Sequence, residues 1–130
     1  MCDNTSDEEK VQIMLKKIEK RYGAVPFVNQ TLSDRPDLFI PAVHFGTAVM
    51  EGKSEFTNKM RYLFAVAAAT ALGSENCIEV QLDHAIKAGA TRDEVLEVMM
   101  ISSLMAMTRS QSTAFRKYQN AFTDAENDTK

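Results

Sequence analysis

Cysteine, basic tracts and long apolar runs are all scarce or missing in this sequence of 130 residues. Only Cys2 and Cys77 are present, and a reducing compartment argues against a stable disulfide between them. The net charge is −3 and no basic tract occurs, so the electrostatic footprint of a nucleic-acid-binding protein is absent. No apolar run approaches the roughly 20 residues that span a bilayer, and the acidic N-terminus does not resemble a signal peptide. We therefore expect a cytoplasmic protein with no nucleic-acid or membrane partner.

The alternation of apolar and polar residues that marks β-strands is also missing, as is a glycine-rich phosphate loop. Apolar residues instead recur at helical spacing between glycine, proline and capping residues. A chain of 130 residues with 45% apolar content can bury one core. We expect an all-α fold: a single compact domain of six to seven helices over residues 7–123, between disordered tails at residues 1–6 and 124–130.

Capping residues and glycines predict where each helix begins and ends. Thr91 and Glu94 form a capping box, three residues apart, that predicts the start of the sixth helix. The last helix is expected to start after Met107. The other signals are Ser6 or Asp7 at the start of the first helix, Gly23 at its end, Ser54 and Glu55 at the start of the fourth, and Ser74 at the start of the fifth.

Cys77 is the first candidate for chemistry. If Ser74 is the N-cap, Cys77 occupies the third helical position, where free N–H groups and the helix dipole stabilise a thiolate. The carboxylates of Glu75 and Glu79 oppose this effect. The alternative interpretation is that Cys77 is a small buried hydrophobic residue, as free cysteines often are. Cys2, expected on the N-terminal tail, is a possible resolving thiol.

Gln81 and His84 follow Cys77 on the same helical face, four and seven residues further on. A histidine can serve as a general base or proton shuttle near neutral pH. The alternative is a half-exposed His84 that is hydrogen-bonded to water or to a carboxylate such as that of Glu79. A metal site needs three or four convergent ligands, and even with His44 the sequence makes no case for one. We expect no metal and no cofactor.

Five short motifs occur in order between about residues 20 and 115. They are Tyr22-Gly23-Ala24-Val25-Pro26, Arg35-Pro36-Asp37-Leu38, Arg61-Tyr62-Leu63, Cys77-Ile78, and Ala88-Gly89-Ala90-Thr91 with Glu94-Val95. Together they resemble the carboxymuconolactone decarboxylase and alkylhydroperoxidase D-like family. The resemblance implies an alkylhydroperoxidase D-like helical domain that assembles into homo-oligomers, either trimers or hexamers. It also implies a site for a small-molecule substrate near the start of the Cys77 helix, close to a subunit interface.

Peroxidase-type members of that family carry a Cys-x-x-Cys, a histidine four residues after the second cysteine and a glutamate twelve residues before the first. At the matching positions this chain has Ser74, Cys77, Gln81 and Tyr62. A disulfide-forming cycle needs an attacking thiol and a resolving one, and Ser74 is neither. The resemblance therefore leads to a one-cysteine thiol peroxidase or reductase. In it Cys77 reacts, His84 and Tyr62 relay protons, and Cys2 or an external thiol reductant resolves the product.

Two other functions stay open. A decarboxylase acting on a small carboxylated lactone or related acid needs a proton donor, which His84 or His44 can supply. It also needs a cationic clamp for the carboxylate, for which Arg61 and Arg109 are candidates. The remaining possibility is a non-catalytic, ligand-binding or structural oligomer that uses the same pocket without turnover.

Overall fold

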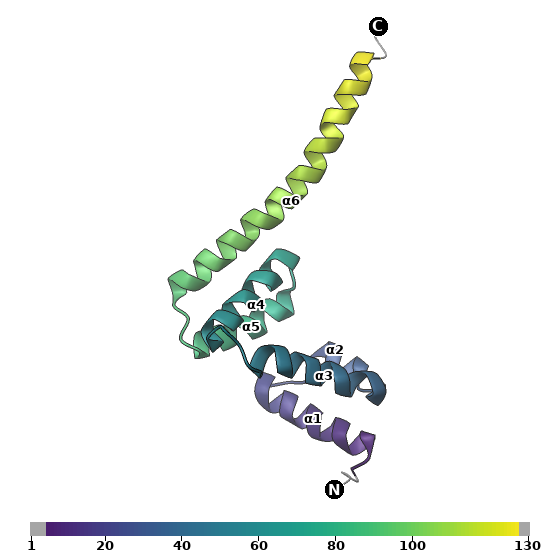
Figure 1. Ribbon diagram of the computed structural model, residues 1–130, viewed down its shortest axis with the longest axis vertical. Helices are drawn as coiled ribbons and strands as arrows, with labels where there is room; N and C mark the ends of the chain where they lie inside the picture. The colour runs from purple at the N-terminus through teal and green to yellow at the C-terminus, as the bar shows by residue number, and fades with distance from the viewer. Residues whose placement is uncertain (1–4, 128–130) are drawn as a thin grey trace. The chain divides into compact units, whose positions relative to one another are not determined.

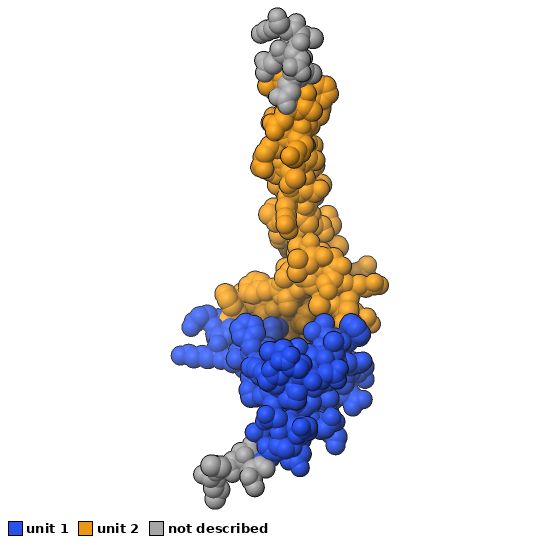
Figure 2. All heavy atoms as spheres, turned by 90° about the vertical axis from the view of Figure 1, so that its right-hand side faces the viewer, with its two compact units in different colours: residues 1–55 blue, residues 56–130 orange. Residues whose placement is uncertain are grey.

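The computed structural model describes residues 5–127 of the chain, and the side chains of residues 5–123 (Figure 1). The described residues form six α-helices and no β-strand, which confirms the all-α prediction and the expected number of helices. They divide into two compact units, residues 1–55 and 56–130, called unit 1 and unit 2 (Figure 2). The helices are α1 (Asp7–Tyr22), α2 (Phe27–Leu32) and α3 (Pro36–Glu51) in unit 1, and α4 (Asn58–Leu72), α5 (Glu75–Lys87) and α6 (Arg92–Asn127) in unit 2.

Helix α1 begins and ends at the residues that its sequence predicts. The Ser6 hydroxyl accepts a hydrogen bond from the Glu9 N–H at 3.2 Å, and the Glu9 carboxylate accepts one from the Ser6 N–H at 3.0 Å. This reciprocal pair is a capping box, and it satisfies two of the N–H groups that a helix start leaves without partners. Gly23 ends the helix in the left-handed conformation, with φ of 80°.

The core of unit 1 lies between α1 and α3. Val11 and Ile18, seven residues apart on α1, face Phe39 of α3, which is completely buried. Half-buried apolar side chains surround these three, among them Met14, Leu32 and Val43. The core of unit 1 is small, and the Phe39 ring is its main contribution to stability. Burying one aromatic side chain removes about 150–250 Å² of surface from water.

Unit 2 is built on an antiparallel pair of helices, α4 and α5, with the first part of α6 packed against α4. Gly73 closes the tight turn between α4 and α5 in the left-handed conformation, with φ of 67°. Leu63 and Val66 of α4 are buried against Ala85 of α5. The small side chain of Ala85 allows the two helices to approach closely, and this fixes the register of the pair.

Lys59 at the start of α4 and Glu94 at the start of α6 form a half-buried ion pair at 2.8 Å. The Glu94 carboxylate also accepts the Thr91 N–H at 2.8 Å, and the Thr91 hydroxyl accepts the Glu94 N–H at 3.1 Å, so the predicted capping box is present. The bond from Lys59, followed by that from the Thr91 backbone, holds the pKa of Glu94 below its ordinary value.

Two predicted boundaries are wrong. Helix α4 starts at Asn58, with Thr57 as the N-cap whose hydroxyl accepts the Met60 N–H, and not at Ser54. The expected last two helices form the single helix α6, which continues through Met107. Hydroxyl groups in this stretch bond back to carbonyls one turn earlier, as Thr108 does to Leu104 at 2.9 Å, so they do not interrupt the helix.

Helix α6 extends to Asn127, the last residue that the structure describes. The domain limits expected at residues 7 and 123 stay predictions. No helix within residues 5–127 combines the length and the apolar character that crossing a membrane requires.

Candidate functional site

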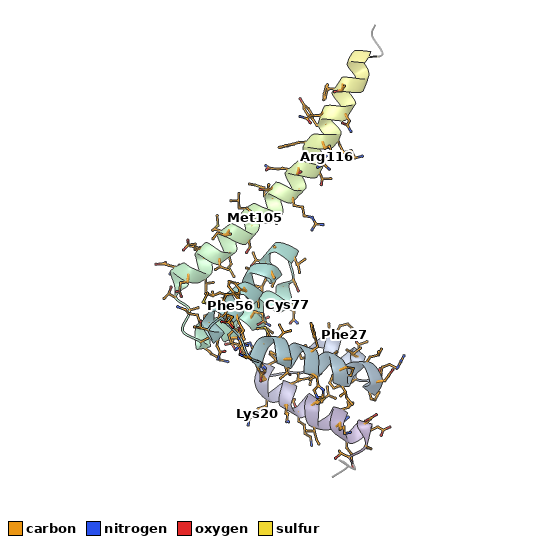
Figure 3. All side chains as sticks on the ribbon, viewed as in Figure 1. Lys20, Phe27, Phe56, Cys77, Met105 and Arg116 are labelled. Carbon is orange, nitrogen blue, oxygen red and sulfur yellow. The ribbon has the colours of Figure 1, made fainter. Side chains whose placement is uncertain are left out.

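Cys77 lies on the first turn of α5 and is exposed (Figure 3). The interpretation of Cys77 as a buried hydrophobic residue is therefore wrong. Ser74 is at the N-cap with extended backbone angles, φ −85° and ψ 90°, and its carbonyl accepts the Ile78 N–H at 2.9 Å. Its side chain makes no capping hydrogen bond, contrary to the predicted capping role. The N–H groups of the first turn, around Cys77, therefore lack the usual side-chain acceptor.

Tyr62 of α4 and His84 of α5 lie face to face. Their ring centroids are 5.1 Å apart and their planes are inclined by 18°, which is a stacked arrangement. Both side chains are half-buried. The antiparallel register explains the pair, because the start of α4 lies beside the end of α5. The structure thus brings together two residues that are far apart in the sequence, one near the start of α4 and the other near the end of α5.

The tautomer of His84 follows from its backbone contact. Nδ1 lies 3.0 Å from the Val80 carbonyl oxygen, one turn earlier in α5. A carbonyl only accepts, so Nδ1–H donates this bond and the lone pair of the neutral imidazole is on Nε2. The Nδ1 partner is thus a backbone oxygen and not the Glu79 carboxylate considered from the sequence. This bond also fixes the plane of the ring that stacks on Tyr62.

Cys77 is separated from the Tyr62–His84 pair along α5. Seven residues of helix correspond to a rise of about 10 Å between Cys77 and His84. Figure 3 labels Phe56, next to the start of α4, and Cys77 at the opposite end of the α4–α5 pair. The Cys77 thiol therefore lies beside the C-terminal end of α4, whereas Tyr62 belongs to the first turns of α4. The row of thiol, amide and imidazole expected on one face of α5 is present, but its two ends are two turns apart.

Gln81 occupies the middle of this row. The side chain is half-buried, and Oε1 is a buried oxygen with no hydrogen-bond partner among the residues that the structure describes. A buried carbonyl oxygen without a donor is costly, so such atoms usually bind water or a ligand. Gln81 therefore offers an acceptor between Cys77 and His84.

The candidate residues for substrate binding are dispersed. Arg61, next to Tyr62 on α4, donates from Nη2 to the Asn58 side-chain oxygen at 2.8 Å. Arg109 is exposed on α6, beyond the part of that helix that packs against α4. His44 belongs to unit 1 and is exposed on α3. Cys2 lies outside the described residues. Within the described part of the chain, no cluster of three His, Cys, Asp or Glu side chains is placed to hold a metal ion.

His44 lines a cavity that the sequence did not predict. This cavity has a volume of about 640 Å³ and is formed by α1, α2 and α3 of unit 1. Its apolar lining includes Met14 and Leu32, and its rim carries Lys17 and the ion pair between Arg21 and Glu51. The Arg21 guanidinium also lies 5.4 Å from the centroid of the neighbouring Tyr22 ring, a cation–π distance. The sequence feature that indicates this cavity is the helical periodicity of α1, since positions 14, 17, 18 and 21 share one face of the helix.

A family model of the carboxymuconolactone decarboxylase family matches residues 36–119, which is most of the chain. The chain belongs to the carboxymuconolactone decarboxylase family. The matched region begins with α3 and ends within α6, so it contains the whole α4–α5 pair. Helices α1 and α2, which supply about half of the residues lining the unit 1 cavity, lie outside the match. Searches of curated proteins and of solved structures found no significant match.

Proposed function

We propose that this member of the carboxymuconolactone decarboxylase family is a one-cysteine, thiol-dependent peroxidase or reductase that reacts through Cys77. One observation supports the proposal most directly: Cys77 is exposed on the first turn of α5, where Ser74 provides no side-chain cap. Thiolates are the reactive form of cysteine, and uncapped N–H groups at a helix start stabilise them.

The reaction balances with two small-molecule partners. The Cys77 thiolate attacks the terminal oxygen of an organic hydroperoxide, the O–O bond breaks, and the alkoxide takes up a proton to leave as an alcohol. The sulfur is oxidised to a sulfenic acid. One external thiol then displaces water to form a mixed disulfide, and a second external thiol releases Cys77 and leaves as a disulfide. The sum is one hydroperoxide and two thiols converted to an alcohol, a disulfide and water.

The resolving thiol must come from outside the α5 turn, because that turn contains no second sulfur. Ser74, three residues before Cys77, cannot form a disulfide. Gln81 offers its buried Oε1 as an acceptor for a water or a hydroxyl group between the thiol and His84. In this proposal His84, two turns further along α5, and Tyr62, which stacks on it from α4, supply protons through that intervening group.

The test measures organic hydroperoxide consumption with dithiothreitol as the reductant. We expect Cys77→Ser to lose all activity above the uncatalysed rate and Cys2→Ser, the matched control, to retain it. Mass spectrometry of the protein treated with hydroperoxide and dimedone should place the sulfenic acid adduct on Cys77. Unchanged turnover in Cys77→Ser would rule out the proposal, as would an adduct on Cys2 alone.

A second candidate is the binding, with or without decarboxylation, of a small carboxylated lactone or related acid. The unit 1 cavity favours it, because an apolar pocket with Lys17 and His44 at its edge, beside the Arg21–Glu51 ion pair, suits an apolar body carrying a carboxylate. Here Cys77→Ser should be tolerated, and His44→Ala should weaken binding of the acid measured by calorimetry. Binding of such an acid without any turnover would identify the non-catalytic alternative. Loss of decarboxylation in His84→Ala or Arg61→Ala would instead locate the reaction in unit 2.

A further inference from the structure

Helix α6 continues well beyond the part of unit 2 that supports it. Its 36 residues correspond to a length of about 54 Å. Val98, Met99 and Ser102 are buried or half-buried on the side that packs against α4, but every side chain from Met107 to Thr123 is exposed. Figure 1 shows the second half of α6 with no other helix of unit 2 beside it. Isolated helices of this length are marginal in water, so this half needs a partner surface.

The exposed half carries a regular stripe, which we call the α6 seam. Its members alternate at spacings of three and four residues, the heptad pattern of helices that pair with one another. At 100° per residue the centre of the seam lies about 130° around the helix from Val98 and Ser102, so most of the seam faces away from α4. The seam consists of Ile101, Leu104, Thr108, Gln111, Phe115, Tyr118 and Phe122.

The α6 seam has the size of one half of a protein interface. Its five apolar members and the flanking Met100 and Met107 are each between 48% and 63% exposed. From the surface of large apolar side chains we estimate that covering them would bury about 700 to 900 Å². A standard interface buries about 800 Å² on each partner, whereas the largest exposed apolar patches on monomers are about 300–600 Å².

We propose that a second copy of this chain covers the α6 seam, with the two α6 helices antiparallel. The pattern fits itself in that direction: Ile101 meets the partner's Tyr118, Leu104 meets the partner's Phe115, and Thr108 meets the partner's Gln111. The layers of Ile101 with Tyr118 and of Leu104 with Phe115 then place an aliphatic side chain opposite an aromatic one, which fills space more evenly than like pairs, while Phe122 lies level with Glu97 of the second copy. The two polar residues meet in the middle, where their side chains can hydrogen-bond across the axis.

Charge supports the antiparallel direction. Residues 98–123 contain three cations, Arg109, Arg116 and Lys117, and no anion. A parallel pair would place all three cations beside their own copies, whereas in the antiparallel pair only Arg109 stays close to its copy, and Arg116 and Lys117 lie next to the uncharged Ser103 and Ser102 of the partner. The two helix dipoles also oppose one another in this arrangement. A two-fold contact of this kind accommodates the hexamer that the family resemblance implies, but not a lone trimer.

The first experiment is size-exclusion chromatography with light scattering on the full chain at about 100 μM. We expect an even number of chains for the native sequence and at least a tenfold rise in the dissociation constant for Phe115→Lys. Thr113→Lys adds the same charge on the opposite side of α6 and should leave the mass unchanged. A monomeric native chain would overturn the proposal, and so would an assembly that Phe115→Lys does not weaken.

The second experiment tests the direction of pairing in a Cys2→Ser, Cys77→Ser background. Leu104→Cys and Phe115→Cys chains, mixed and oxidised, should form a disulfide between the two kinds of chain. Leu104→Cys alone should form almost none, because the antiparallel register separates the two copies of position 104 by about 16 Å. Efficient cross-linking of Leu104→Cys with itself would mean a parallel pair and would overturn the proposed arrangement.

Discussion

Tyr62 and His84 stack at 5.1 Å between centroids and thereby join the start of α4 to the end of α5. The contact has two consequences. It links the two helices on which unit 2 is built, and it places an imidazole whose Nδ1 faces the Val80 carbonyl against a phenol ring. The pair is therefore as much a structural element of unit 2 as a candidate proton relay, and stability measurements can separate the two roles.

Substitutions of Tyr62 should distinguish packing from proton transfer. Tyr62→Ala should lower the free energy of unfolding by about 1–3 kcal/mol, because it removes a half-buried ring together with the stacking contact that this ring makes with His84. Tyr62→Phe keeps the ring and should stay within about 1 kcal/mol of the native chain. Urea unfolding gives both values. If Tyr62→Phe also reduces hydroperoxide turnover several-fold, the phenol oxygen contributes to the chemistry; equal losses of stability in both variants would argue against the stack as the stabilising contact.

Ser74→Cys should restore a working pair of sulfurs. Residues 74 and 77 are three apart at the start of α5, which places their Cβ atoms about 5–6 Å apart before local adjustment. In a Cys2→Ser background, mild oxidation should remove both free thiols of this variant without forming dimers. Thiol titration and non-reducing electrophoresis measure this outcome. The matched control Ser103→Cys has its new thiol on α6 and should keep both thiols. Persistent free thiols in Ser74→Cys would show that the first turn of α5 cannot close.

Replacing each of two glycines by alanine should change the free energy of unfolding in opposite directions. Gly73 has φ of 67°, where a Cβ is strained whatever the space around it, so Gly73→Ala should lower the free energy of unfolding by about 1–2 kcal/mol. Gly46 lies inside α3 with no atom within 4 Å of an added Cβ, so Gly46→Ala should raise it by about 0.5–1 kcal/mol. Thermal and urea unfolding report both changes. A stabilising Gly73→Ala would mean that the turn between α4 and α5 does not use the left-handed conformation.

The stability of unit 2 should fall in acid partly through Glu94. Its pKa in the folded state is lowered, chiefly by the hydrogen bond from Lys59. A carboxyl group with a depressed folded pKa contributes stability that is fully present above its unfolded value, near 4.5, and lost as the pH falls through the folded value. Glu94→Gln should therefore lose less stability than the native chain between pH 6 and pH 3.

Urea unfolding followed across that pH range measures the difference for Glu94→Gln. The control is Glu97→Gln, which removes the same charge from the neighbouring turn of α6. An identical pH dependence of the native chain and Glu94→Gln would contradict the role of the Lys59 contact.

Local signals in the sequence were enough to define most of the helices. Ser6 with Glu9, Thr91 with Glu94, and Gly23 each act through neighbours within one turn, so their effect does not depend on the rest of the fold. Local reasoning failed at Met107, after which the sequence predicts a separate last helix although serine and threonine residues continue α6. Their side chains bond to carbonyls of the same helix instead, and no glycine or proline is present to end it.

The sequence by itself determined that the chain is helical, that it belongs to the carboxymuconolactone decarboxylase family, and that α5 carries one cysteine where a pair is expected. Only the tertiary structure decided that Cys77 is exposed, that Tyr62 stacks on His84 two turns away from it, and that α1 to α3 enclose a cavity. The physical reason is the distance along the chain over which each kind of interaction acts. Caps and helical periodicity depend on residues within a few positions, whereas exposure and stacking depend on the register between helices, which packing around residues such as Ala85 sets.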